Sequence, residues 1–184
     1  STNITDVFFD LDHTLWDFDK NSELAFNRIF KDKFPEINCN DFIEKYIPIN
    51  QACWKLYQND KITHLELRYN RLKFSFDALN IVISDEDINQ IANDYIEFLT
   101  DNNHLFDGAI EVLEYLKPKY KLHIITNGFA NVQDKKINNA ALSGYFSTIT
   151  NSELAGVKKP NSIIFDYAVR LAQASKENCL MIGD

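Results

Sequence analysis

Glycine and proline are scarce in this sequence, with five and four among its 184 residues. A flexible low-complexity linker is therefore not expected, and no internal repeat is found. The residues are 45% hydrophobic and 13% aromatic, which is enough for a sizeable core and argues against disorder. The length suits one domain, or a compact core that carries a smaller inserted domain.

Basic runs and long apolar runs are also missing. The 19 Lys and Arg residues are outnumbered by 27 Asp and Glu, which gives a formal net charge of -8. Proteins that bind a nucleic-acid polymer normally carry a basic face. No segment approaches the roughly 18 apolar residues of a membrane span, and STNITDVFF at the start lacks the features of a signal peptide. We therefore expect neither nucleic-acid polymers nor membranes as partners.

Cysteine is the third scarce residue, present only as Cys39, Cys53 and Cys179. Their number is odd and their spacing matches no metal motif, so they are interpreted as reduced thiols of a cytoplasmic protein. The histidines likewise lack the spacing of metal ligands.

Four short apolar runs predict buried strands, at residues 7–10, 122–126, 148–150 and 179–182. They are hydrophobic throughout rather than alternating, as expected in a parallel sheet that is covered on both faces. Helical patterns lie between the later runs. This order predicts right-handed crossovers and an α/β fold with a doubly wound parallel sheet.

Residues 16–103 interrupt that order, because their patterns are helical throughout. Two capping boxes mark helix starts, one with Thr63 and Glu66 and the other with Ser84 and Asp87. A helical block placed directly after the first strand indicates an inserted all-helical cap domain. The predicted domains are a core of residues 1–15 and 104–184 and a cap of residues 16–103.

Polar side chains directly follow three of the predicted strands. Asp10 and Asp12 end the first, Thr126 and Asn127 end the second, and Asp184 ends the last. In an open parallel sheet, ligands bind beyond the carboxyl ends of the strands. Two acids at the tip of a buried strand also require a compensating positive charge. The sequence therefore predicts a reactive site at this edge of the sheet.

The order of these motifs resembles that of the haloacid dehalogenase (HAD) superfamily phosphatases. Four motifs match, namely DxDxT in Asp10-Leu11-Asp12-His13-Thr14, then Thr126, then Lys159 before Pro160, and the start of the fourth in Gly183-Asp184. The stretches LWDFDKNSELAF, WKLYQNDKITHLELRYNRL and LHIITNGFANVQDKKI further resemble the YjjG-type pyrimidine 5'-nucleotidases. The family continues beyond its fourth motif, so the resemblance implies a HAD Rossmann-like core whose C-terminal part is truncated.

The resemblance implies a phosphomonoester hydrolase that depends on Mg²⁺. A carboxylate nucleophile divides phosphate-ester hydrolysis into two steps through an aspartyl phosphate, and Asp10 matches that position. Asp12 would protonate the leaving oxygen and then deprotonate the attacking water.

The remaining motif residues would hold the phosphate and the metal. By resemblance, the phosphoryl group is bound by Thr126, Asn127 and Lys159, and Mg²⁺ by the side chains of Asp10 and Asp184 and the backbone carbonyl of Asp12. Trp16 and Phe18 follow the catalytic acids and are candidates for stacking on a base, although both also suit a packing role.

The expected substrate is a small phosphorylated metabolite, in first place a pyrimidine nucleoside monophosphate. A phosphatase or phosphomutase for another metabolite, of the phosphoglycolate or sugar-phosphate type, shares all four motifs. Haloacid dehalogenation needs the nucleophile but not the second acid, so Asp12 argues against it. The alternative from a different class is a catalytically inactive binding module. Nothing in the sequence indicates the oligomeric state.

Overall fold

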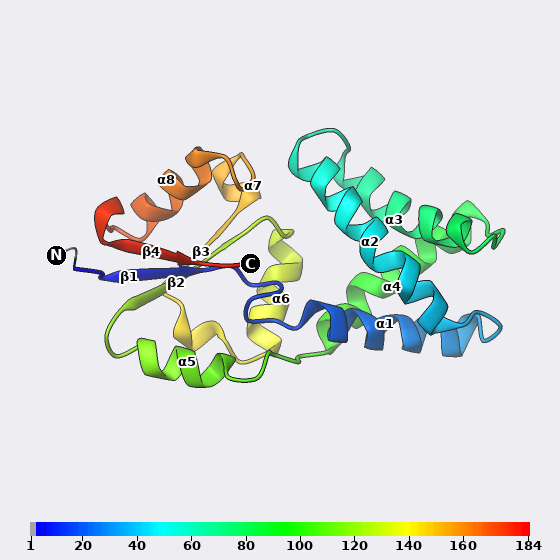
Figure 1. Ribbon diagram of the computed structural model, residues 1–184, viewed down its shortest axis with the longest axis horizontal. Helices are drawn as coiled ribbons and strands as arrows, with labels where there is room; N and C mark the ends of the chain where they lie inside the picture. Colours follow the sequence, from blue (N-terminus) through cyan, green and yellow to red (C-terminus); the bar gives the residue numbers. More distant parts are fainter. Residues whose placement is uncertain (1–2) are drawn as a thin grey trace. The chain divides into compact units, whose positions relative to one another are not determined.

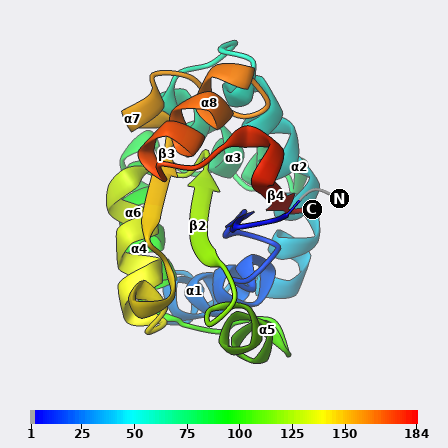
Figure 2. The same ribbon diagram turned by 90° about the vertical axis from the view of Figure 1, so that its left-hand side faces the viewer.

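The computed structural model describes residues 3–184 of the chain. Within them, one sheet is formed by β1 (Asp6–Phe9), β2 (Lys121–Thr126), β3 (Thr148–Asn151) and β4 (Cys179–Ile182). The strand order is β3-β2-β1-β4, and every neighbouring pair is parallel (Figure 2). The α/β fold with a parallel sheet that the sequence predicts is therefore confirmed.

Helices cover both faces of this sheet (Figure 1). On one face lie α5 (Ala109–Leu116) and α6 (Ala130–Asn139), and on the other lie α7 (Ser152–Ala155) and α8 (Ser162–Leu171). Two short 3-10 helices, η1 (Ser143–Tyr145) and η2 (Lys176–Asn178), precede β3 and β4. β1 and most of β2 are buried because helices shield them from water on both sides. The predicted burial of residues 179–182 is wrong, since Leu180 and Met181 of the edge strand β4 are 48% and 38% exposed.

The packing of α8 shows how the sequence pattern produces this arrangement. Ile164 and Ala168 are spaced by one helical turn, so they share one face of the helix. Both are fully buried, in a cluster that includes Phe8 of β1 and Ile125 of β2. The apolar face of the helix therefore holds it against the centre of the sheet.

A buried histidine links three of the strands. His123 of β2 has its Nδ1 2.7 Å from Oγ1 of Thr148 in β3 and its Nε2 2.7 Å from Oδ2 of Asp6 in β1. Burial lowers the pKa of His123, against the opposing effect of the Asp6 carboxylate. The neutral ring can donate one hydrogen bond and accept the other, so both contacts are satisfied while the imidazole itself carries no charge.

The chain divides into two compact units. One comprises the residues up to Phe18 together with Asn103–Asp184, and the other comprises Asp19–Asn102. Residues 16–18 and Asn103, expected from the sequence to belong to the helical block, lie in the unit that contains the sheet. The reason is local, because Trp16 forms a backbone bridge with Leu105 and the Asp17 amide donates to the His104 carbonyl.

The second unit consists of helices, which are α1 (Phe18–Lys33), α2 (Cys39–Gln58), α3 (His64–Ala78) and α4 (Asp85–Asp101). Its core contains a cluster of buried rings in stacked and edge-to-face contacts, contributed by Phe26, Phe30, Phe42, Tyr46, Phe76 and Tyr95. The capping box of Thr63 and Glu66 is present at the start of α3. No helix in residues 3–184 is long and apolar enough to cross a membrane.

Candidate active site

The first acid of the predicted site is paired with the predicted lysine. Asp10 follows β1 directly, and its Oδ1 lies 2.9 Å from Nζ of Lys159 and accepts a 2.9 Å hydrogen bond from the Leu11 amide. The ammonium group also donates to the carbonyl of Ile125 in β2, at 2.9 Å. Burial raises the pKa of the Asp10 carboxyl; Lys159 lowers it, and the carboxylates of Asp12 and Asp184 raise it further.

The second acid is held from a different direction, by α6. Nζ of Lys136 donates to Oδ1 of Asp12 at 2.9 Å, and Nε2 of Gln133 donates to Oδ2 at 3.0 Å. Both donor side chains are buried, with 1% of Gln133 and 2% of Lys136 exposed. The two acids therefore have separate partners, although only Leu11 lies between them in the sequence.

Thr126 ends β2 with a hydroxyl whose acceptor sites are both used. Its Oγ1 accepts one hydrogen bond from Nε2 of Gln133 at 2.8 Å and another from the Gly128 amide at 3.0 Å. A hydroxyl has two acceptor lone pairs and one proton. The Thr126 proton is therefore left to donate to an acceptor such as a phosphate oxygen.

Asn127 fixes the loop that carries Lys159. Its side-chain Oδ1 accepts from the Lys159 amide at 2.7 Å, and its Nδ2 donates to the Lys159 carbonyl at 3.0 Å. Both ends of the amide group are thus engaged with one backbone residue. The predicted phosphate contact of Asn127 stays a prediction, whereas its contact with the lysine loop is part of the structure.

The carboxyl end of β4 closely approaches the first acid. The Asp10 amide donates to the Ile182 carbonyl at 2.9 Å, and a Cβ added to Gly183 would lie 3.3 Å from Cβ of Asp10. Glycine thus leaves room for the backbone of β4 beside the Asp10 side chain, and it places Asp184 where its carboxylate raises the pKa of Asp10.

These features have counterparts in known proteins. A family model described as "haloacid dehalogenase-like hydrolase" matches residues 6–184. The chain belongs to this family. It is therefore a hydrolase, as the sequence motifs predict, and its core has the HAD Rossmann-like fold.

Relatives of this HAD-like hydrolase include two named pyrimidine 5'-nucleotidases. YjjG of Escherichia coli is 33% identical over 179 residues, which cover 97% of this chain and 76% of the relative. PynA of Streptococcus pneumoniae is 31% identical over 183 residues, which cover 97% of this chain and 74% of the relative. A crystal structure of the putative HAD-hydrolase YfnB from Bacillus subtilis, described as bound to magnesium, matches with a TM-score of 0.89 at 30% identity and covers 99% of this chain and 80% of that one.

The donor set for a metal in this HAD-like hydrolase consists of oxygens. Within residues 3–184, no three His, Cys, Asp or Glu side chains lie close enough to hold a metal ion by themselves. One reason is that Asp12 turns its carboxylate towards α6. The carboxylates of Asp10 and Asp184 and the carbonyl of Asp12 nevertheless fit Mg²⁺, which commonly binds one or two carboxylates and completes its shell with substrate oxygens and water.

Trp16 and Phe18 are buried beside the second acid. Trp16 has no exposed side-chain surface and Phe18 is 8% exposed. The Lys136 ammonium lies 4.4 Å from the centre of the Trp16 ring and 5.2 Å from that of Phe18. A base therefore finds no exposed face of Trp16 on which to stack, and the specificity role of Phe18 stays a prediction.

Gln133 and Lys136 were missed by the sequence motifs. Both lie in NVQDKKI, three residues apart and therefore on one face of α6, next to the buried Ile137. The sequence feature that could have revealed them is the presence of polar residues on the apolar side of a short amphipathic helix. Such residues need buried partners, and the two motif residues Asp12 and Thr126 supply them.

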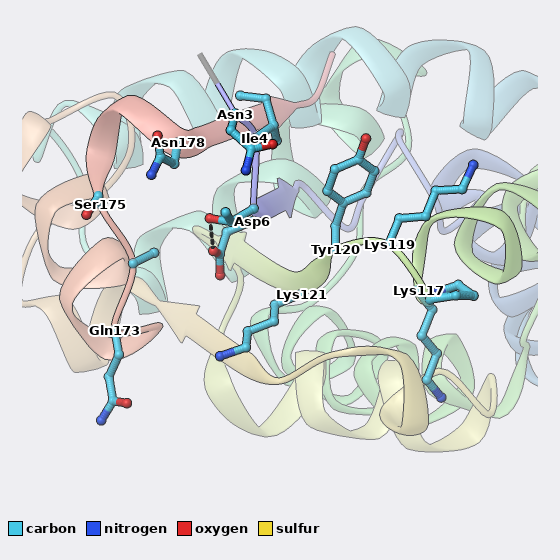
Figure 3. Close-up of a pocket in the computed structure, with 13 residues that line it drawn as sticks. Asn3, Ile4, Asp6, Lys117, Lys119, Tyr120, Lys121, Gln173, Ser175 and Asn178 are labelled. Carbon is cyan, nitrogen blue, oxygen red and sulfur yellow. Dashed lines mark hydrogen bonds between the residues drawn. The ribbon is translucent and has the colours of Figure 1, made fainter. Parts of the chain in front are cut away.

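A separate cavity of about 1040 Å³ lies at the opposite, N-terminal ends of β1 and β2 (Figure 3). Three lysines line it, but Lys117, Lys119 and Lys121 point in different directions. The ammonium groups of Lys117 and Lys119 lie over the rings of Tyr145 and Tyr115. The lysines therefore do not converge on one point, and this cavity contains none of the motif residues.

Proposed function

We propose that this HAD-like hydrolase is a phosphomonoesterase that uses Asp10 as its nucleophile. The observation that carries the proposal is the partly buried Asp10 carboxylate with the Lys159 ammonium 2.9 Å away, beside a Thr126 hydroxyl whose proton is left to donate. A cation and a hydroxyl donor next to a carboxylate suit an anionic electrophile such as a phosphoryl group.

In the first step, an oxygen of Asp10 forms a bond to phosphorus and the ester P–O bond breaks. The leaving oxygen takes a proton from the Asp12 carboxyl, and an aspartyl phosphate remains on Asp10. Lys159 and Thr126 hold the equatorial phosphoryl oxygens, whose charge must be stabilised by position and electrostatics.

In the second step, water attacks phosphorus and gives a proton to the Asp12 carboxylate. The bond between Asp10 and phosphorus breaks, which releases inorganic phosphate and restores the Asp10 carboxylate. The proton that Asp12 lost in the first step is thereby returned in the second.

Mg²⁺ is the proposed cofactor, held by Asp10, Asp184 and the carbonyl of Asp12. When bound, it would neutralise negative charge on the phosphoryl oxygens and help to orient them. Burial raises the pKa of Asp10, and Asp12 and Asp184 raise it further; this gathering of carboxylates supports a cation at this position.

The proposed substrate is a pyrimidine nucleoside 5'-monophosphate. This assignment is supported by the two nucleotidase relatives, which match almost the whole chain. Dehalogenation has weaker support, because it does not require a second acid, and here Asp12 is held by two buried donors. The role of residues 19–102 as a specificity cap remains part of the proposal.

The test is a screen of phosphorylated metabolites with the wild type and Asp10→Asn, each with and without Mg²⁺. We expect the highest kcat/KM for pyrimidine nucleotides, dependence on Mg²⁺, and no turnover by Asp10→Asn because an amide cannot form the acyl phosphate. Near-normal turnover of p-nitrophenyl phosphate by Asp10→Asn would contradict the assignment of the nucleophile.

A further inference from the structure

Both carboxylate oxygens of Asp12 receive a hydrogen bond from α6. Lys136 donates to Oδ1 and Gln133 donates to Oδ2. A carboxylate held at both oxygens cannot rotate freely about its Cβ–Cγ bond. Each oxygen retains a second lone pair, so the group stays able to carry a proton while its plane is fixed.

The amide of Gln133 joins two motif residues. Its single nitrogen carries two protons, and these serve Oδ2 of Asp12 and Oγ1 of Thr126. The amide faces Asp12 with its nitrogen, which is the donor end of the group. Within residues 3–184, the other end, Oε1 of Gln133, is buried without a hydrogen-bond partner. The amide therefore leaves its own acceptor unsatisfied while it serves both motif residues.

The surroundings fix both donors in place. A Cβ on Gly128 would lie 2.3 Å from Cδ of Gln133, so only glycine leaves room for the glutamine at this point. The Lys136 ammonium lies over the rings of Trp16 and Phe18, which restricts a side chain that is otherwise flexible.

We infer that Gln133 and Lys136 are positioning residues for the proton transfers of Asp12. They hold the carboxyl in the orientation from which it gives a proton to the leaving oxygen and then takes one from water. This inference rests on the proposed phosphomonoesterase function and adds two residues outside the four motifs to its machinery.

The nature of the leaving group separates positioning from packing. An alkoxide, such as the 5'-oxygen of a nucleoside, leaves poorly unless it is protonated, whereas p-nitrophenolate leaves without a proton. The value of kcat/KM reports the steps up to the first irreversible one, which includes departure of the leaving group. Misplacement of Asp12 must therefore lower kcat/KM more for an alkyl phosphate than for p-nitrophenyl phosphate.

The experiment compares Gln133→Met and Lys136→Met with the wild type on a nucleoside 5'-monophosphate and on p-nitrophenyl phosphate. We expect kcat/KM to fall about tenfold to a hundredfold on the nucleotide, which is a part of the roughly 10²–10⁴-fold that acid–base catalysis usually contributes, and no more than about threefold on the aryl ester. Asp12→Asn should show the same selectivity, and adding Gln133→Met to it should cost little more. Lys135→Met, on the exposed side of α6, is the matched control and should behave as wild type on both substrates.

Equal losses on the two substrates in Gln133→Met would overturn the inference, because a misplaced proton donor must slow the alkyl ester more than the aryl ester. Gln133→Met removes no charge, so the two substrates can be compared with this variant alone if Lys136→Met fails to fold. Asp10→Asn is measured in parallel, so that a failure of the proposed function can be told apart from a failure of the positioning role. If Asp10→Asn stays active, the proposed function fails; if it is inactive while Gln133→Met shows no selectivity, only the positioning role fails.

Discussion

The Lys159 ammonium lies 2.9 Å from Oδ1 of Asp10, and only 16% and 19% of these two side chains are exposed. Burial and two neighbouring acids raise the pKa of this carboxyl, and Lys159 lowers it. The pair therefore contributes both to the stability of the unit and to the charge balance of the candidate site.

Lys159→Met should consequently destabilise the protein as well as inactivate it. The variant leaves the Asp10 carboxylate largely buried without its cation, which should lower the free energy of unfolding by about 1–3 kcal/mol in urea titrations. Asp10→Asn added to Lys159→Met should recover part of that loss, because it removes the unpaired charge. If the double variant is less stable than Lys159→Met by the full cost of a second independent mutation, the two residues are not coupled.

Mg²⁺ should raise the melting temperature of the wild type. A ligand that binds only the folded state stabilises it by mass action, and the carboxylate of Asp184 lies near enough to add to the rise that burial causes in the pKa of Asp10. The gain should be absent in Asp10→Ala with Asp184→Ala and unchanged in Asp166→Ala, an exposed acid on α8. A melting curve that does not move across millimolar Mg²⁺ in the wild type contradicts the proposed metal site.

Stability should fall at mildly acidic pH because of His123. Burial lowers its pKa below the usual 6.5 in the folded state, so between these two values the unfolded chain binds a proton that the folded chain does not. The free energy of unfolding should therefore decrease as the pH drops from 7.5 through 6.5 to 5, with a contribution from this group of at most about 1.4 kcal/mol per pH unit. His123→Asn should flatten that dependence; an unchanged slope would assign it to other groups.

Gly128→Ala should impair catalysis through Gln133. The new methyl group would meet Cδ of the glutamine at 2.3 Å and displace it, so kcat/KM for a nucleotide should fall about as far as in Gln133→Met. Gly144→Ala is the control, since a Cβ there meets no atom within 4 Å. Full activity in Gly128→Ala would show that the glutamine can move without consequence.

Much of the fold follows from patterns that are local in the sequence. Apolar strands such as β1, helix caps such as Thr63 and the strand-end acids are each encoded within a few residues. The contacts of Gln133 and Lys136 are not, because each reaches a partner more than 120 positions earlier in the chain. The contacts of His123 and Trp16 also depend on distant parts of the chain. The spacing of His123 gives no hint of its bonds to Asp6 and Thr148, and the burial of Trp16 depends on a return of the chain at Leu105.

The central claim is that Asp10 becomes phosphorylated during turnover. Its most direct test is acid quenching of the enzyme during hydrolysis of a nucleotide with a radiolabelled phosphoryl group, followed by peptide mapping. The label should be found on the peptide that contains Asp10 and should be absent from Asp10→Asn. Rapid turnover without labelled protein, or a label that persists in Asp10→Asn, would contradict the mechanism.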